Sequence, residues 1–244
     1  MLPFIGTLIG CGCVLFMKSC MSDRMRSALL GFAGGIMVAA SVWSLIIPAM
    51  EYSEGLGRLA FIPAAIGFLL GVGFLMIIEH LTPMLDGKGD GLSKTGKLVL
   101  AVGIHNVPEG MAVGAVFAGL ASGDAGITLA GAIGLSVGIA IQNVPEGAIV
   151  SMPLKAEGKG KGASFFAGFL SGVVEPLGAF ITLYAVSLIL PVLPYLLGFA
   201  AGAMIYVVVN DLVPEMAISS YEKLGASMFA IGFTVMMMLD VMLG

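Results

Sequence analysis

The residues best suited to chemistry lie in two nearly identical hexapeptides. His-Asn-Val-Pro-Glu-Gly occupies positions 105–110, and Gln-Asn-Val-Pro-Glu-Gly occupies positions 142–147. Both lie inside strongly apolar stretches, where a charged side chain at the centre of a bilayer costs about 2.5 to 3.5 kcal/mol on insertion scales. His105 and Glu109 are four residues apart and therefore share one face of a helix, and the second motif repeats this spacing. We therefore interpret each motif as a column of metal ligands.

Each motif also contains a proline and an asparagine. Pro108 and Pro145 remove one backbone donor each, which frees carbonyl oxygens at membrane depth. Such freed groups are tolerated only beside a cavity or other protein. Asn106 and Asn143 add side-chain oxygens one step around the helix. The motifs are therefore expected to face a polar cavity.

A third intramembrane carboxylate, Glu175, stands beside a proline in another apolar run. Together with Glu109 and Glu146 it makes three acidic groups that cannot all be ionised at close range without a cation. His105 and Gln142 add an imidazole and an amide, and this mixed set suits Zn²⁺, Fe²⁺, Mn²⁺ or Cd²⁺ rather than Cu(I). The set lacks four strong ligands, which favours transient occupancy over a closed structural site.

The composition indicates a polytopic membrane protein. Hydrophobic residues make up 59% of the chain, charged residues only 11%, and the mean hydropathy is +1.07, which excludes a soluble globular domain. Apolar runs of about 20 residues, enough to cross a hydrocarbon core of about 30 Å, predict an all-α fold with eight transmembrane helices. The runs lie at 2–21, 28–50, 59–81, 97–120, 125–153, 163–190, 194–214 and 223–243.

Little of the chain falls outside these spans, so we expect one transmembrane transporter domain over 1–244. The longest connecting loop is predicted at 82–96. Ten of the eleven Lys and Arg residues fall on alternating loops, and only Arg58 falls on the other side. The positive-inside rule then predicts a cell-membrane protein with the 82–96 loop in the cytoplasm and both termini outside.

Glycines recur four residues apart on nearly every span. This small-xxx-small spacing predicts helix backbones in close contact, because small residues let membrane helices approach one another. The pairs are Gly6/Gly10, Gly31/Gly35, Gly67/Gly71, Gly110/Gly114, Gly134/Gly138, Gly168/Gly172 and Gly198/Gly202.

A short internal match favours symmetry within the chain. The second span ends with Ile-Pro-Ala-Met-Glu at 47–51, and the seventh ends with Leu-Val-Pro-Glu-Met at 212–216. These two spans run in opposite directions through the membrane in the predicted topology. We interpret the match as an inverted repeat of helices 1–3 and 6–8 around helices 4–5.

The two hexapeptides resemble the central motifs of the ZIP (Zrt/Irt-like) divalent metal transporters, and the chain is similar to the GufA-like bacterial branch over essentially its whole length. The resemblance implies a transport site in which Glu109 and Glu146 bridge two adjacent metals. It assigns His105, Gln142 and Glu175 to one metal, and Asn106, Asn143 and Glu175 to the other. It also implies that Met37, in the second span, contributes a thioether, and that the protein is a homodimer with an elevator- or rocker-like motion.

Two positions depart from the family pattern. Gln142 stands where many relatives carry His, and Asn143 stands where some carry Asp. One metal position therefore loses charge and is expected to bind weakly or transiently.

Polar residues near the ends of the spans are candidates for the entry and exit of the substrate. Asn210 and Asp211 lie near the inner end of the seventh span, and Glu51 and Asp240 lie near the outer ends of the second and eighth. Solvated helix-end groups are an equally good interpretation of these four residues.

The resulting hypothesis is a divalent metal uptake transporter, with zinc or another divalent metal as substrate and with the lipid bilayer, not nucleic acid, as its environment. One alternative is a proton-coupled carrier of a non-metal substrate that uses the buried glutamates. An intramembrane metallohydrolase would need a fuller ligand set such as His-Glu-x-x-His, and the chain contains only His80 and His105, so we predict that it is not an enzyme. The sequence leaves carrier and selective channel both open.

Overall fold

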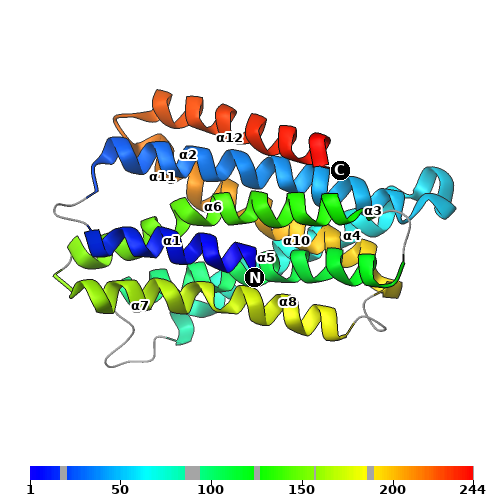
Figure 1. Ribbon diagram of the computed structural model, residues 1–244, viewed down its shortest axis with the longest axis horizontal. Helices are drawn as coiled ribbons and strands as arrows, with labels where there is room; N and C mark the ends of the chain where they lie inside the picture. The colour runs from blue at the N-terminus through cyan, green and yellow to red at the C-terminus, as the bar shows by residue number, and fades with distance from the viewer. Residues whose placement is uncertain (17–20, 86–93, 124–126, 157, 186–189, 244) are drawn as a thin grey trace.

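The computed structural model describes residues 1–16, 21–85, 94–123, 127–156, 158–185 and 190–243, without the side chains of 81–85, 94–101, 105, 156, 190 and 243. All regular structure in these ranges is helical (Figure 1), as the sequence predicted. The longer elements are α1 (Leu2–Phe16), α2 (Asp23–Ala40), α3 (Ile47–Glu51), α4 (Phe61–Leu85), α5 (Lys94–Ala121), α6 (Leu129–Ala156), α7 (Lys161–Gly172), α8 (Val174–Tyr184), α10 (Leu193–Val207), α11 (Val213–Ile218) and α12 (Glu222–Leu243). Short 3-10 segments lie at Glu54–Leu59 and Leu190–Val192.

Each range predicted to span the membrane contains a helix, and six helical stretches of the described chain are long and apolar enough to cross a bilayer. They are Asp23–Glu51, Phe61–His80, Leu129–Lys155, Lys161–Tyr184, Leu193–Ile218 and Glu222–Met242. Helix α1 is shorter, with 15 residues. The total of eight crossings therefore stays a prediction.

Two predicted boundaries differ from the structure. The loop predicted at 82–96 is shorter, because α4 continues to Leu85 and α5 begins at Lys94. Met84 and Leu85 are good helix formers, and this propensity explains why α4 continues into the range predicted as loop. The span predicted at 163–190 is divided between α7 and α8, four residues before Pro176, whose missing N–H leaves the carbonyl of Gly172 without its helical partner.

Glycines line the four closest helix pairs, α1 with α6, α2 with α12, α4 with α10 and α5 with α8. A Cβ atom added to Gly31 would lie 2.0 Å from the carbonyl oxygen of Gly225, and one added to Gly110 would lie 2.2 Å from that of Glu175. Since real Cβ atoms do not approach so closely, these positions require glycine. The close packing predicted from the glycine spacing is confirmed at these contacts.

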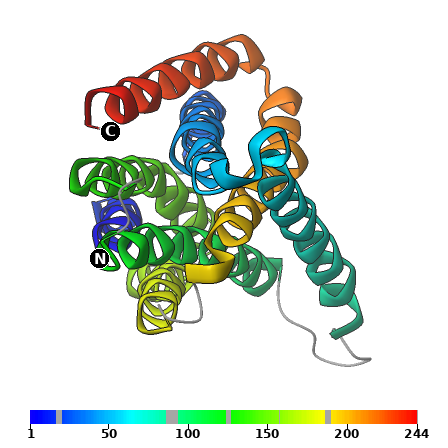
Figure 2. The same cartoon turned by 90° about the vertical axis from the view of Figure 1, so that its right-hand side faces the viewer.

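The helices form two bundles (Figure 2). Helices α1, α5, α6, α7 and α8, here the first bundle, pack mainly on one another, and α2, α3, α4, α10, α11 and α12, the second bundle, do the same. Between the bundles, α6 contacts α2 and α12, and α5 contacts α10. At this boundary a Cβ on Gly138 would meet the flexible side chain of Met236 rather than backbone. At this point of the boundary, a flexible side chain separates the two helices.

Two long helices of the second bundle contain a π-helical segment followed by a proline. The segment η1 (Ser41–Ile46) joins α2 to α3, where Pro48 follows, and η4 (Val208–Leu212) joins α10 to α11, where Pro214 follows. Single π-helical turns inside α-helices occur frequently at functional sites. Both segments lie beside the cavities described below.

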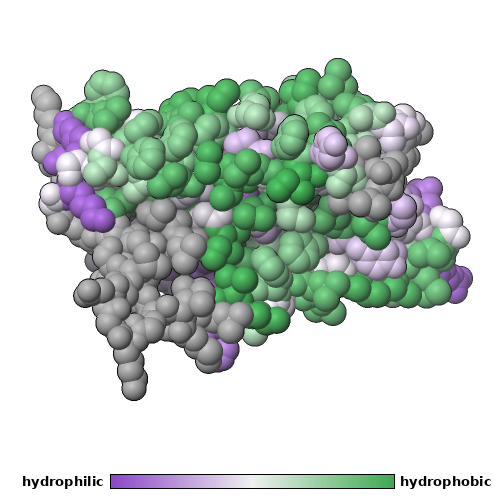
Figure 3. All heavy atoms as spheres, turned by 90° about the horizontal axis from the view of Figure 1, so that it is seen from below, coloured by the Kyte–Doolittle hydropathy of each residue, from purple (hydrophilic) through white to green (hydrophobic). Residues whose placement is uncertain are grey.

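Hydrophobic side chains cover the middle of the face shown in Figure 3, and hydrophilic ones gather towards its two ends. Large apolar residues are exposed on the surface of the protein, among them Leu69, Ile77, Phe180 and Val241. An exposed apolar belt between polar ends is the surface expected of a protein surrounded by lipid.

Candidate metal centre

The two hexapeptide motifs meet inside the first bundle, next to α8. Helix α5 supplies Asn106 and Glu109, and α8 supplies Glu175, all three of them buried. Helix α6 supplies the buried Gln142 and Asn143 and the half-buried Glu146. Both α5 and α6 continue past the proline of their motif. We call these six residues the central cluster.

Gln142 joins the carboxylates of the two motifs. Its Nε2 donates a hydrogen bond of 2.8 Å to Glu109 Oε1 and another of 3.0 Å to Glu146 Oε2. The two glutamates predicted to share a metal are therefore held close to one amide. This contact requires α5 and α6 to pack side by side, as they do.

Glu175 is held by two donors on one of its oxygens. Thr7 Oγ1 in α1 donates to Glu175 Oε1 over 2.6 Å, and Asn106 Nδ2 donates to the same atom over 3.2 Å. Asn106 Nδ2 also donates to the backbone carbonyl of Ser171, at 3.0 Å. The second oxygen of Glu175 stays free of these donors.

Five oxygen atoms of the central cluster are buried without a hydrogen-bond partner in the described part of the chain. They are Asn106 Oδ1, Glu109 Oε2, Gln142 Oε1, Asn143 Oδ1 and Glu175 Oε2, and Asn143 Nδ2 is unpaired as well. Buried polar atoms in folded proteins are normally paired, so such a group of unpaired acceptors is unusual. Carboxylate and amide oxygens are ligands for divalent cations, and a cation among them would satisfy this set.

The cluster mixes carboxylates with amides. Within the described residues, no three His, Cys, Asp or Glu side chains come close enough together to hold a metal ion by themselves. The carboxylates are separated by the amide groups of Asn106, Gln142 and Asn143. Any metal held here by the described side chains would need these amides as ligands.

Two further ligands were predicted from the sequence, His105 and Met37. His105 belongs to α5, but its side chain lies outside the described residues. Met37 is buried in α2 and lines a cavity that also contacts Gln142 and Glu146. The structure thus places the thioether of Met37 across from the motif of α6, in the second bundle.

This cavity, here the large cavity, measures about 450 Å³ and reaches the central cluster from one side. Its wall includes Asn210 and Asp211, the residues predicted at the exit. Glu79 of α4 and Glu215 of α11 add two further carboxylates. The cavity therefore connects the cluster to the α11 end of the molecule through a series of acidic side chains.

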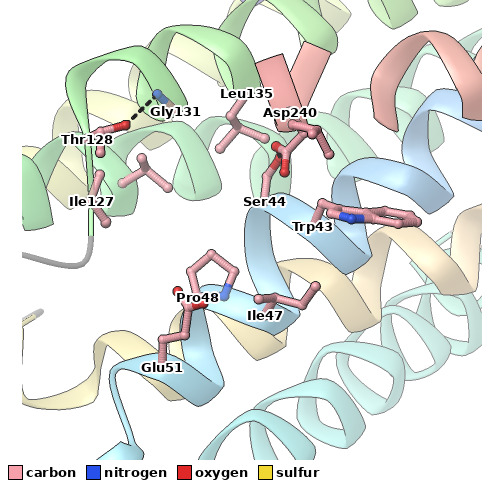
Figure 4. A pocket seen from close by; sticks show the side chains of 12 residues that line it. Trp43, Ser44, Ile47, Pro48, Glu51, Ile127, Thr128, Gly131, Leu135 and Asp240 are labelled. Carbon is pink, nitrogen blue, oxygen red and sulfur yellow. Dashed lines mark hydrogen bonds between the residues drawn. The ribbon is translucent and has the colours of Figure 1, made fainter. Parts of the chain in front are cut away.

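A second cavity of about 300 Å³, here the small cavity, lies towards the opposite end of α2 (Figure 4). Its wall includes Glu51 and Asp240, the residues predicted at the entry, and Ser44 of η1 donates a hydrogen bond to Asp240. No residue of the central cluster lines it. Along α6, Ile139 is fully buried one turn beyond Leu135 of the cavity wall, so apolar packing lies between this cavity and the cluster.

Sequence reasoning missed two contributors. Thr7 is buried in α1 and donates to Glu175, but a single threonine in an apolar helix gives no motif. Glu79 lies in the large cavity and accepts a 2.6 Å hydrogen bond from Tyr206 and bonds of 3.2 Å from Asn210. Its position inside an apolar run was a usable signal, because an acidic residue there is costly unless it has a function or a partner.

Comparison with known proteins identifies the family. The sequence model described as ZIP Zinc transporter matches residues 94–240, which is more than half of the chain and includes both motifs and Glu175. The chain belongs to the ZIP zinc transporter family. This confirms the resemblance inferred from the motifs.

Several ZIP relatives align with nearly the whole chain. Zinc transporter ZIP11 of Homo sapiens is 36% identical over 95% of this chain and 92% of its own length. Zinc transporter GufA of Myxococcus xanthus is 35% identical over 98% of this chain and 96% of its own length. Zinc transporter ZIPB of Bordetella bronchiseptica is 36% identical over 99% of this chain and 79% of its own length. The similarity therefore includes the helices α1, α2 and α4 that precede the matched family region.

Proposed function

We propose that this protein carries divalent metal ions, foremost Zn²⁺, across the cell membrane into the cytoplasm. It is a transporter rather than an enzyme, and the metal is its substrate rather than a resident cofactor. The observation that supports this most is the group of unpaired buried oxygens in the central cluster. The ZIP relatives are named zinc transporters, and a bound Zn²⁺ would pair with these oxygens.

The site that we propose holds two adjacent metals bridged by Glu109 and Glu146. One metal would take His105, Gln142 and Glu175, and the other Asn106, Asn143 and Glu175. The contacts of Gln142 with both bridging carboxylates support the close spacing that this arrangement requires. Met37 faces the same region from the large cavity and would add a soft ligand.

The two cavities support an alternating-access mechanism. The large cavity reaches Gln142 and Glu146, whereas the small cavity is lined by no cluster residue. A second state would open the small cavity to the cluster and close the large one. Movement of the first bundle along the second could achieve this, because backbone-to-backbone glycine contacts hold each bundle together while side chains fill the boundary at Gly138.

The orientation in the proposal follows from the basic residues. The last turns of α1, α6 and α11 lie at one end of the molecule in Figure 1, and the segment that carries Arg58 lies at the other. The positive-inside rule places the first of these ends in the cytoplasm. The large cavity would then open inward, α1 would run inward and α12 would run outward, as expected if both termini face the outside.

The proposed architecture is a single domain with eight crossings and an inverted repeat. Gly-Phe-Ala-Gly-Gly-Ile-Met at 31–37 in α2 parallels Gly-Phe-Ala-Ala-Gly-Ala-Met at 198–204 in α10, and a π-helical segment and a proline follow each. The closest helix pairs support the same symmetry, because α2 packs on α12 as α10 packs on α4, and α1 packs on α6 as α8 packs on α5. The homodimer implied by the resemblance belongs to the proposal and is tested by the mass of the purified protein in detergent.

Flux of Zn²⁺ into proteoliposomes tests the function. Purified wild-type protein should give saturable uptake, and Glu146→Ala and His105→Ala proteins should give little above empty vesicles. Glu222→Ala provides the control, because Glu222 is exposed at the start of α12, away from the cluster. Wild-type rates in both the Glu146→Ala and the His105→Ala protein would refute the assigned site, and a proton flux without metal uptake would favour a carrier of a non-metal substrate.

A further inference from the structure

The four carboxylates in the wall of the large cavity have different partners. Glu79 accepts hydrogen bonds from Tyr206 and Asn210, Asp211 accepts one from Asn210, and Glu146 accepts one from Gln142. The donors of these hydrogen bonds are neutral, and Asp211 has a further interaction besides this one. Glu215 forms an ion pair with Arg26, which is the one salt bridge found among the described residues.

The ion pair lies at the mouth of the large cavity, where that cavity, bordered by Glu215, meets a neighbouring pocket of about 370 Å³ that both Arg26 and Glu215 line. Arg26 belongs to the first turn of α2, Glu215 belongs to α11, and their side chains are 45% and 36% exposed. Ser27, next to Arg26, donates a 3.0 Å hydrogen bond to the carbonyl of Tyr221, which fixes the start of α2 against the turn before α12. Arg26 is thus held beside Glu215 while Glu215 faces the route from the central cluster.

The pair does not connect the two bundles, because α2 and α11 both belong to the second one and contact each other directly. It is also partly exposed, and exposed ion pairs contribute little to stability and are screened by salt. Stabilising the fold is therefore a poor explanation of the Arg26–Glu215 ion pair. A fixed positive charge does change what else can bind to the carboxylate, since it competes with any other cation.

We propose that Arg26 is a competing cation that prevents Glu215 from retaining the transported metal at the mouth of the large cavity. A metal leaving the cluster can bind Glu79, which has neutral donors, then displaces Arg26 from Glu215, and is itself displaced when the guanidinium returns. Glu215 is therefore a weak final ligand, and Arg26 speeds release. This inference rests on the proposed function, because it assumes that metal passes through the large cavity.

Four variants test the inference: Arg26→Gln, Arg26→Lys, Glu215→Gln and the double variant Arg26→Gln/Glu215→Gln. Equilibrium binding of Zn²⁺ to each detergent-purified protein is measured first. Arg26→Gln should bind one additional Zn²⁺ per chain, and both Arg26→Lys and the double variant should bind as the wild type does. In proteoliposomes, Arg26→Gln should show a lower KM and a lower maximal rate, and removing Glu215 in the same chain should restore both.

A purely structural role predicts a different pattern. If the pair only fixed α11 to α2, Arg26→Gln and Glu215→Gln would have the same effect on thermal stability and transport, and the double variant would resemble either single one. Unchanged Zn²⁺ stoichiometry in Arg26→Gln, or no rescue by Glu215→Gln, would overturn the inference. Absence of Zn²⁺ flux in the wild type would instead refute the proposed function, and the binding measurement would still decide whether Arg26 competes for Glu215.

Discussion

The two copies of the hexapeptide motif differ in environment although they share the Asn-Val-Pro-Glu-Gly sequence. In α5, Asn106 is fixed by the carbonyl of Ser171 and by Glu175, and Glu109 is fully buried. In α6, both polar atoms of the Asn143 side chain are unpaired, and Glu146 lines the large cavity. The same sequence therefore forms one half of the site that is fixed and one half that is accessible.

The neighbouring helices account for this difference. The motif glycine of α5, Gly110, packs against the backbone of α8 at Glu175, whereas that of α6, Gly147, packs against the backbone of α1 at Thr7. One neighbour supplies a carboxylate, and the other supplies a hydroxyl that donates to that same carboxylate. A near-symmetric pair of motifs thus gives an asymmetric site, because the residues around the motifs are not repeated.

The largest expected effect comes from the accessible half. Glu146→Gln should weaken Zn²⁺ binding by about 2 to 5 kcal/mol, since it removes one member of a buried charge interaction. This corresponds to a loss of roughly 30- to 5,000-fold in affinity, measured by titration of the purified protein. Glu222→Gln, which changes an exposed carboxylate on α12, should bind normally. If Glu146→Gln and Glu222→Gln both changed the Zn²⁺ affinity only slightly, Glu146 would be no more important for binding than an exposed carboxylate.

Backbone contact at the fixed half can be tested with Gly110→Ala. The added Cβ would meet the carbonyl of Glu175 at 2.2 Å, so α5 and α8 must separate. Overpacking of this kind typically costs about 1 to 3 kcal/mol and should lower both the melting temperature and the Zn²⁺ affinity. Gly12→Ala is the matched control, because nothing lies within 4 Å of a Cβ at Gly12. A Gly110→Ala protein as stable as Gly12→Ala would show that the helices can move apart freely.

The two asparagines allow the most direct test of the comparison. Asn106→Ala should destabilise the metal-free protein by about 1 to 3 kcal/mol, because it leaves the carbonyl of Ser171 unpaired. Asn143→Ala removes two polar atoms without a hydrogen-bond partner from a fully buried position, so it should destabilise the metal-free protein less than Asn106→Ala does, while reducing the increase in melting temperature caused by Zn²⁺. Thermal unfolding in detergent with and without Zn²⁺ measures both effects. Identical behaviour of the two variants would contradict the assignment of a fixed and an accessible half.

The smallest effect is expected at Thr7. Thr7→Val keeps the shape of the side chain and removes its donor to Glu175, which should reduce Zn²⁺ affinity by about 1 kcal/mol because Asn106 still donates to the same oxygen. Thr7→Ser retains the hydroxyl and should behave almost as the wild type. Comparable losses in Thr7→Val and Thr7→Ser would point to packing of the methyl group instead.

Much of the fold and the centre of the site could be predicted from the sequence. Long apolar runs gave the helices, and the glycine spacing gave the contacts at Gly31 and Gly110, because both signals depend only on local composition. The two motifs located the central cluster, since ionisable residues inside apolar membrane helices are costly and usually mark a functional site. The ZIP resemblance was confirmed by the family match.

The rest depended on packing that a single helix does not reveal. The role of Thr7 exists only because α1 passes beside α8, and that of Glu79 only because α4 packs on α10 next to Tyr206. The loop after α4 was predicted too long because span length and charge were considered before helix propensity. The interruption before Pro176 was not predicted, although proline geometry was a usable signal for it. The predicted role of His105 stays a prediction, as its side chain lies outside the described residues.

The two π-helical segments have different lengths, so the residues that follow them can face different surroundings in the two halves of the proposed repeat. Segment η1 contains six residues and η4 contains five. One residue rotates an α-helix by about 100°, so two sequences that are in phase before these segments are out of phase after them. In the proposed repeat, the glycine contacts upstream can stay equivalent while the polar residues in and beyond the segments face different surroundings, Ser44 next to Asp240 and Asn210 next to Glu79. In the proposed repeat, a difference of one residue would therefore let the two helices make different polar contacts without disturbing the packing that they share.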